Sequence, residues 1–180
     1  YGIAAILGLG ACGALRAAQL VLGFANVALM GIVPVAMAYA VRAYQRGGLS
    51  RLRHLQTTLI IPGSLWVVTF GAAFYLMPNG VGRAVTGESW TLARDLVPIL
   101  ALSYVFVWAT TINLIALRAS SRVARAALTR VVVTATLLSA SLGLAAARGL
   151  TAAVWGIALA GVLGALASTW SSRVSRVAAR

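Results

Sequence analysis

The stretch LRAAQLVLGFANVALMGIVPVAMAYAV, residues 15–41, decides the fold of this chain. Its only charged side chain is Arg16, and it contains no acidic residue. A helix of about 20 mostly apolar residues is long enough to cross the hydrocarbon core of a bilayer. We therefore expect residues 15–41 to form a transmembrane helix, with a kink at Pro34.

The rest of the chain repeats this apolar pattern. Further spans are predicted at residues 57–77, 96–117, 126–147 and 150–170, and residues 1–12 are expected to be a partial span that ends at a glycine-rich break. Because Tyr1 lies inside an apolar run with no initiator Met, we expect a fragment of a longer protein with its first helix truncated. The predicted fold class is all-α, an integral membrane bundle of about six transmembrane helices in one unit, residues 1–180.

Composition separates a membrane protein from a nucleic-acid binder. The chain is 61% hydrophobic and 9% charged, with a mean hydropathy of +0.94, whereas soluble domains are about 25% charged. The net charge of +13 would suit nucleic acid, but such proteins spread basic residues over a solvated face. Here the arginines gather in short breaks between apolar stretches, which indicates membrane topology and predicts no nucleic-acid binding.

Three dense basic clusters follow alternate spans. They are Arg42, Arg46, Arg51, Arg53 and His54 after the second span; Arg118, Arg122, Arg125 and Arg130 after the fourth; and Arg173, Arg176 and Arg180 after the sixth. Short arginine-rich loops stay on the cytoplasmic side. We therefore expect all three clusters, and both ends of the fragment, to be cytoplasmic.

Four of the five tryptophans are placed as interfacial aromatics are. Trp66, Trp90, Trp155 and Trp170 lie near predicted span ends or in loops. Trp108 lies in the middle of a span, so we expect it to face protein or a cavity.

Groups that carry out catalysis are missing from the predicted spans, which contain no Asp, Glu or His. His54 is expected to be a solvated loop residue, and Glu88 and Asp95 to form a local salt-bridged loop with nearby arginines such as Arg94. The single cysteine, Cys12, excludes an internal disulfide and a multi-cysteine zinc site. We predict no enzymatic activity, no cofactor and no metal site.

One polar stripe points to function. Arg16, Gln19, Gly23 and Asn26 recur at helical spacing, which places them on one face of residues 15–41. An arginine on such a face should look toward protein or a water-filled cavity, and its guanidinium suits phosphate oxygens. Arg16, Gln19 and Asn26 are therefore candidate substrate-binding residues for an anionic headgroup. The alternative is that Arg16 snorkels to the interface while Gln19 and Asn26 bridge helices.

Two weaker polar faces occur on the fourth and fifth spans. They hold Ser103, Thr110 and Asn113 on the fourth, and Arg130, Thr134 and Ser141 on the fifth. Interhelical hydrogen bonding is the favoured role of the first set. Arg130 is expected to snorkel to the cytoplasmic surface.

Several segments, in this order, resemble one transporter family. They are GALRAAQLVLG (residues 13–23), VRAYQRGG (41–48), PNGVGRAVTGESWTLARDLVP (78–98), LRASSRVARAALTR (117–130) and GLTAAVWGIALA (149–160). Together they resemble the second half of polysaccharide flippases in the multidrug/oligosaccharidyl-lipid/polysaccharide exporter superfamily. The resemblance covers essentially the whole chain, although only one bundle is present and its first helix is short.

This resemblance implies two six-helix bundles around a cavity that opens alternately to the two sides of the bacterial cytoplasmic membrane. It implies transport of undecaprenyl-diphosphate-linked oligosaccharide for surface polysaccharide synthesis, with the other six-helix half supplied by the same chain or a partner. Arg16 would approach the diphosphate, and Gln19 and Asn26 would contact diphosphate or sugar hydroxyls. A multidrug-extrusion carrier of the same superfamily, or a non-transporting membrane scaffold subunit, is the alternative.

Overall fold

The computed structural model describes residues 9–121 and 123–174, with some side chains inside these ranges left undescribed. Every element assigned in these ranges is helical, which confirms the all-α prediction for the described part of the chain. The elements are α2 (Leu9–Tyr75), α3 (Asn79–Thr86), the 3₁₀ helix η1 (Gly87–Ser89), α4 (Trp90–Ala119), α5 (Val123–Arg148) and α6 (Leu150–Val174).

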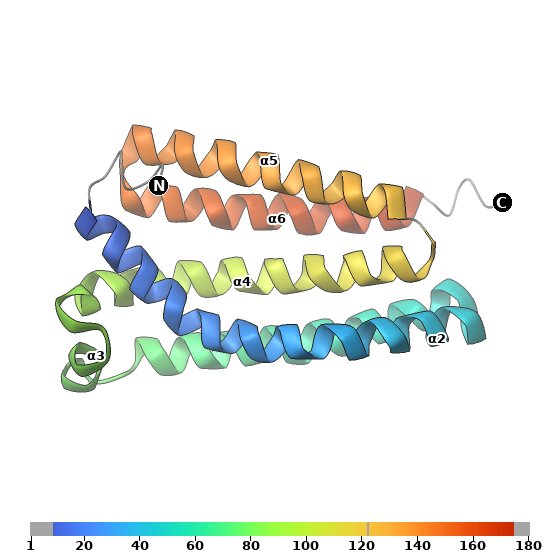
Figure 1. Ribbon diagram of the computed structural model, residues 1–180, viewed down its shortest axis with the longest axis horizontal. Helices are drawn as coiled ribbons and strands as arrows, with labels where there is room; N and C mark the ends of the chain where they lie inside the picture. Colours follow the sequence, from blue (N-terminus) through green and yellow to red (C-terminus); the bar gives the residue numbers. More distant parts are fainter. Residues whose placement is uncertain (1–8, 122, 175–180) are drawn as a thin grey trace.

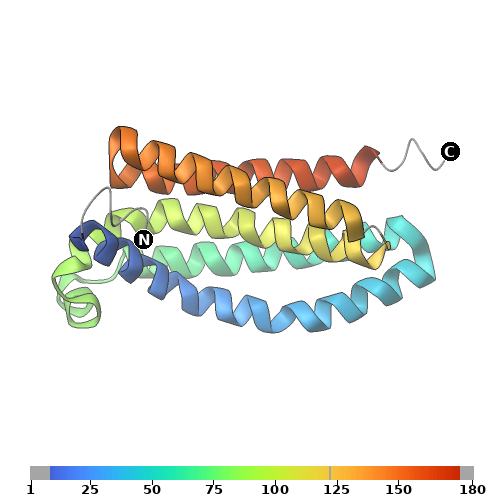
Figure 2. The ribbon, with the colours of Figure 1, turned by 45° about the horizontal axis from the view of Figure 1, so that its top comes forward.

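The longest element, α2, consists of two helical arms joined by a reversal at Gly47 and Gly48. Gly48 has φ 60° and ψ −150°, a backbone region that is essentially restricted to glycine. The arms, residues 9–46 and 49–75, run side by side in opposite directions (Figures 1 and 2). The α2 turn, residues 47–48, therefore joins the two arms into a helical hairpin.

The expected glycine-rich break before residue 15 does not occur in the described residues. The first arm is helical from Leu9 and passes through Gly10 and Gly13 without interruption, because a helix interior tolerates an isolated glycine at about 1 kcal/mol. The remainder of the predicted first span, residues 1–8, lies outside the described residues. The arm also continues through Pro34, and it is curved along its length (Figure 2).

The helices pack in layers. Both views show the α2 hairpin along one side of α4, with the α5–α6 pair on the other side (Figures 1 and 2). The principal interfaces are α2 with α4, α4 with α6, and α5 with α6. Helix α4 is therefore the central rod, and α3 and η1 close the end opposite the α2 turn (Figure 1).

A glycine slot fixes the second arm of α2 against α4. The Trp108 ring lies so close to Gly63 that a Cβ added there would overlap Nε1. The indole N–H donates to the Leu59 carbonyl at 3.0 Å, and the side chain is 2% exposed. The prediction that Trp108 faces protein is confirmed.

Trp90 does not face the lipid headgroups as an interfacial aromatic would, because its side chain is fully buried inside the protein. Its Nε1 donates a hydrogen bond to Asn79 Oδ1 at 2.9 Å. Its ring packs edge-on against Phe74, with the two ring centroids 4.9 Å apart, and Gly82 has no side chain to obstruct it. Packing of α3 and the end of α2 against the first turn of α4 creates this site. The other predicted interfacial residues differ: Trp66 and Trp155 are exposed, and the Trp170 side chain is not described.

Two helices of the described residues are long and apolar enough to cross a membrane, Leu15–Tyr75 and Trp90–Ala119. The first contains both arms of α2. Helices α5 and α6 supply the shorter apolar segments Ala126–Ala140 and Val154–Leu166. The count of six spans stays a prediction.

The outer surface of the bundle is strongly apolar. Large hydrophobic side chains that are more than half exposed occur on α2, α4, α5 and α6. They include Phe24, Val27, Ile61, Leu65, Leu92, Leu128, Val131, Leu159 and Leu166. Exposed large apolar side chains on four helices suit contact with hydrocarbon.

Candidate functional site

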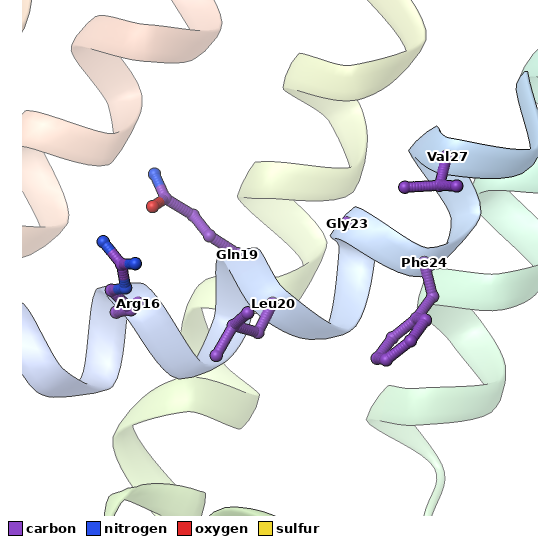
Figure 3. Close-up of a pocket in the computed structure, with 6 residues that line it drawn as sticks. All are labelled: Arg16, Gln19, Leu20, Gly23, Phe24 and Val27. Atoms are coloured by element: carbon purple, nitrogen blue, oxygen red, sulfur yellow. The ribbon is translucent and has the colours of Figure 1, made fainter. Parts of the chain in front are cut away.

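An open pocket lies on the first arm of α2, at the predicted polar stripe. Its volume is about 330 Å³, and we call it the stripe pocket. It is lined by Arg16, Gln19, Leu20, Gly23, Phe24 and Val27 (Figure 3). All six residues come from one helix, so the pocket is a shallow hollow on an exposed helix face.

The opposite face of the same arm positions this pocket. Buried residues recur there at helical spacing and pack into the core: Leu15, Ala18, Leu22, Ala25 and Leu29. Because a helix turns about 100° per residue, burial of this face directs the intervening polar positions outward. The periodicity that predicted the stripe also accounts for its exposure.

Polar and apolar groups are divided within the stripe pocket. The side chains of Arg16 and Gln19 project to the same side of the helix in Figure 3, whereas Leu20 and Phe24 project to the other. Phe24 is 74% exposed, and a Cβ added at Gly23 would meet nothing within 4 Å. The hollow therefore offers guanidinium and carboxamide donors next to apolar surface, a combination that suits an anionic group attached to a hydrocarbon chain.

Asn26, the third candidate residue, lies outside the lining of the stripe pocket. It is half-buried. Asn26 is ten residues after Arg16, so the two side chains point about 80° apart around the helix axis. The structure thus brings Arg16 and Gln19 together and leaves Asn26 at the edge.

One of the three residues on the polar face of α4 joins two helices. Asn113 Oδ1 accepts a hydrogen bond from Gln56 Nε2 of the second α2 arm at 2.9 Å. Ser103 and Thr110 donate instead to carbonyls one turn back in their own helix. The expected interhelical bond is confirmed at Asn113.

A second polar hollow lies between α4, α5 and α6. Arg130 and Thr134 of α5 line it together with Thr110 and Thr111 of α4, and its volume is about 180 Å³. The sequence placed Arg130 and Thr134 on one face, but it gave no sign that α4 threonines would join them. The side chain of Ser141 is not described.

Arg94 contacts the end of α2 and the start of α3. Its Nε donates to the Tyr75 carbonyl at 2.9 Å, its Nη1 donates to Asn79 Oδ1 at 3.3 Å, and its guanidinium lies 5.0 Å from the Tyr75 ring centroid. This contact satisfies a carbonyl at the end of α2 that has no partner within the helix. The Glu88 side chain is not described.

Among the described residues, no group of three His, Cys, Asp or Glu side chains comes together that could hold a metal ion. The chain matches no protein-family model, no curated protein sequence and no solved structure.

Proposed function

We propose that the chain spans the bacterial cytoplasmic membrane and forms one half of a transporter. Its cargo would be an undecaprenyl-diphosphate-linked oligosaccharide, flipped by alternating access for surface polysaccharide synthesis. The main observation behind this proposal is the stripe pocket, where Arg16 and Gln19 offer hydrogen-bond donors on an otherwise apolar helix face.

Two physical arguments support this proposal. The exposed apolar side chains on four helices suit contact with hydrocarbon, because moving apolar surface from water into an apolar environment is favourable. An arginine beside that surface is costly in lipid unless it reaches water, an interface or an anion. A diphosphate headgroup would supply the anion, and its polyprenyl chain would lie against exposed residues such as Leu20 and Phe24.

The shape of the stripe pocket supports a role for a second half. All six lining residues come from one helix, so the pocket is bounded on one side and open on the other. A ligand pocket normally buries most of its ligand. The second wall would come from the other six-helix bundle, as the family resemblance implies.

The test is the loss of transport in Arg16→Ala. In a bacterium whose own flippase has been deleted, we expect no surface polysaccharide with this variant, while its level in the membrane stays normal. Arg83→Ala is the matched control, because Arg83 is an exposed arginine of α3 outside the stripe pocket. Normal polysaccharide display with Arg16→Ala would contradict the role of Arg16.

The one-walled shape also favours a second candidate, a non-transporting scaffold whose partner helix fills the stripe pocket. In a Cys12→Ala background, Gln19→Cys should react with a membrane-impermeant maleimide if the hollow opens to water. Ala18→Cys, at a fully buried neighbouring position, is the unreactive control. Protection of Gln19→Cys from both sides of the membrane would favour the scaffold.

A further inference from the structure

A pocket with three arginines lies at the α2 turn, and its lining comes from both arms. We call it the turn pocket, and its volume is about 370 Å³. The groups that carry the argument are Tyr39, Arg42 and Arg46 from the first arm, and Arg51, His54 and Thr58 from the second. A volume of this size falls within the range of small-molecule sites, about 300–1,000 Å³.

Helical spacing directs these groups into one hollow. Arg42 and Arg46 are four residues apart, so they share a face of the first arm. Arg51 and His54 are three apart and share a face of the second. The reversal at Gly48 turns the two faces toward each other.

Gly47 sets the position of Arg51. A Cβ added at Gly47 would lie 2.9 Å from both Cβ and Cδ of Arg51. Only glycine lets the base of this arginine approach the backbone of the turn so closely. The turn therefore holds one cationic side chain against its own main chain, beside the two arginines of the other arm.

The turn pocket has a large excess of positive charge. Like charges four residues apart destabilise a helix, and a third arginine faces them from the other arm. The chain has only two acidic residues, Glu88 and Asp95. They belong to η1 and the first turns of α4, at the end of the bundle opposite the α2 turn (Figure 1). Neither of these two side-chain carboxylates lies near the arginines of the turn pocket, so an anion from outside the chain would find an uncompensated positive charge there.

We propose that the turn pocket binds a phosphate group. Guanidinium groups bind phosphate oxygens through paired, charge-assisted hydrogen bonds. Both a phospholipid headgroup and free inorganic phosphate offer this chemistry. Tyr39 is 57% exposed at the edge of the pocket, as aromatic side chains at the headgroup level of a membrane are. The site is separate from the stripe pocket, and it does not depend on transport of a lipid-linked sugar.

The test compares two neighbouring arginines of the second arm. Arg51 lines the turn pocket, whereas Arg53 faces a different, small hollow next to α4. The purified protein in an uncharged detergent is titrated with inorganic phosphate, and separately with short-chain phosphatidylglycerol, with phosphatidylcholine as the zwitterionic control lipid. We expect Arg51→Gln to weaken phosphate binding by about tenfold or more, because a charged hydrogen-bond partner is lost, and Arg53→Gln to leave it within about twofold.

The outcome of the titration either identifies the ligand of the turn pocket or rejects the proposal. Binding of phosphatidylglycerol alone identifies a lipid headgroup as the ligand, and binding of both probes identifies a general phosphate site. Binding of neither probe, or equal weakening by Arg51→Gln and Arg53→Gln, overturns the proposal. If Arg51→Gln fails to fold, Arg42→Gln replaces it, since Arg42 is an exposed residue of a continuous helix. Loss of phosphate binding without loss of polysaccharide transport separates this site from the proposed function.

Discussion

The two arms of α2 differ in what covers their surfaces. The second arm is tied to α4 by the Trp108 indole lying against Gly63 and by the Gln56–Asn113 hydrogen bond. The outer face of the first arm, from Arg16 to Val27, is open, and its lining comes from that helix alone. We infer that residues on the covered surface determine stability, whereas residues on the open face are available for a ligand or a second bundle.

The largest effect that tests this comparison is expected at Gly63. A Gly63→Ala methyl would collide with Trp108 Nε1 and displace the indole from the Leu59 carbonyl. We expect a loss of about 2–3 kcal/mol of unfolding free energy from overpacking, measured by SDS titration of the purified protein. On the first arm, Gly31→Ala meets nothing within 4 Å and should instead gain about 0.5–1 kcal/mol. Similar losses in the two variants would refute the inferred difference between the arms.

The next effect concerns the turn that joins the arms. Gly48→Ala places a side chain at φ 60° and ψ −150°, which costs about 1–3 kcal/mol. The same titration should show this loss, and phosphate binding at the turn pocket should weaken with it. An unchanged unfolding midpoint would mean that the reversal is not held in this backbone conformation.

A smaller effect is expected for the polar link between the second arm and α4. A double-mutant cycle with Gln56→Leu and Asn113→Leu should give a coupling energy of about 0.6 kcal/mol, as interhelical hydrogen bonds in membranes average. The two single variants and the double variant are compared by unfolding titration. Strict additivity of the two single changes would show that the Gln56–Asn113 bond contributes nothing to the interface.

The smallest effect on stability is expected on the open face. Arg16 is exposed in the stripe pocket, so Arg16→Ala should change the unfolding free energy by less than about 0.5 kcal/mol. Polysaccharide display is nevertheless expected to be lost in this variant. A large loss of stability would show that Arg16 is a structural residue, and the proposed binding role would then fail.

Local patterns in the sequence were enough to predict the apolar parts of the long helices and the position of the stripe, but not that residues 42–46 and 49–56, expected in a turn, are also helical. Apolar length gave the helical segments, and spacing placed Arg16 and Gln19 on one exposed face. Burial of Trp108 followed from its place inside an apolar run. Asn26 lies outside the lining of the stripe pocket because residues ten apart drift around a helix axis, and its binding role stays a prediction.

Features that depend on contacts between separate elements could not be predicted. Trp90 directly follows η1, and only the packing of α3 against the start of α4 shows that it is buried. The glycines at positions 10 and 13 resemble a break as much as Gly47 and Gly48 do. The difference is that the backbone reverses at one pair and stays helical at the other.

The close fit of Trp108 into Gly63 has a mechanical consequence. With no gap between ring and backbone, the second α2 arm and α4 cannot slide past each other without unseating the indole, so they should move as one rigid body. Helices α5 and α6 meet this body mainly where α6 runs along α4, with Gly161 packed on Phe106. Any motion of the α5–α6 pair relative to this body would therefore take place at the α4–α6 interface.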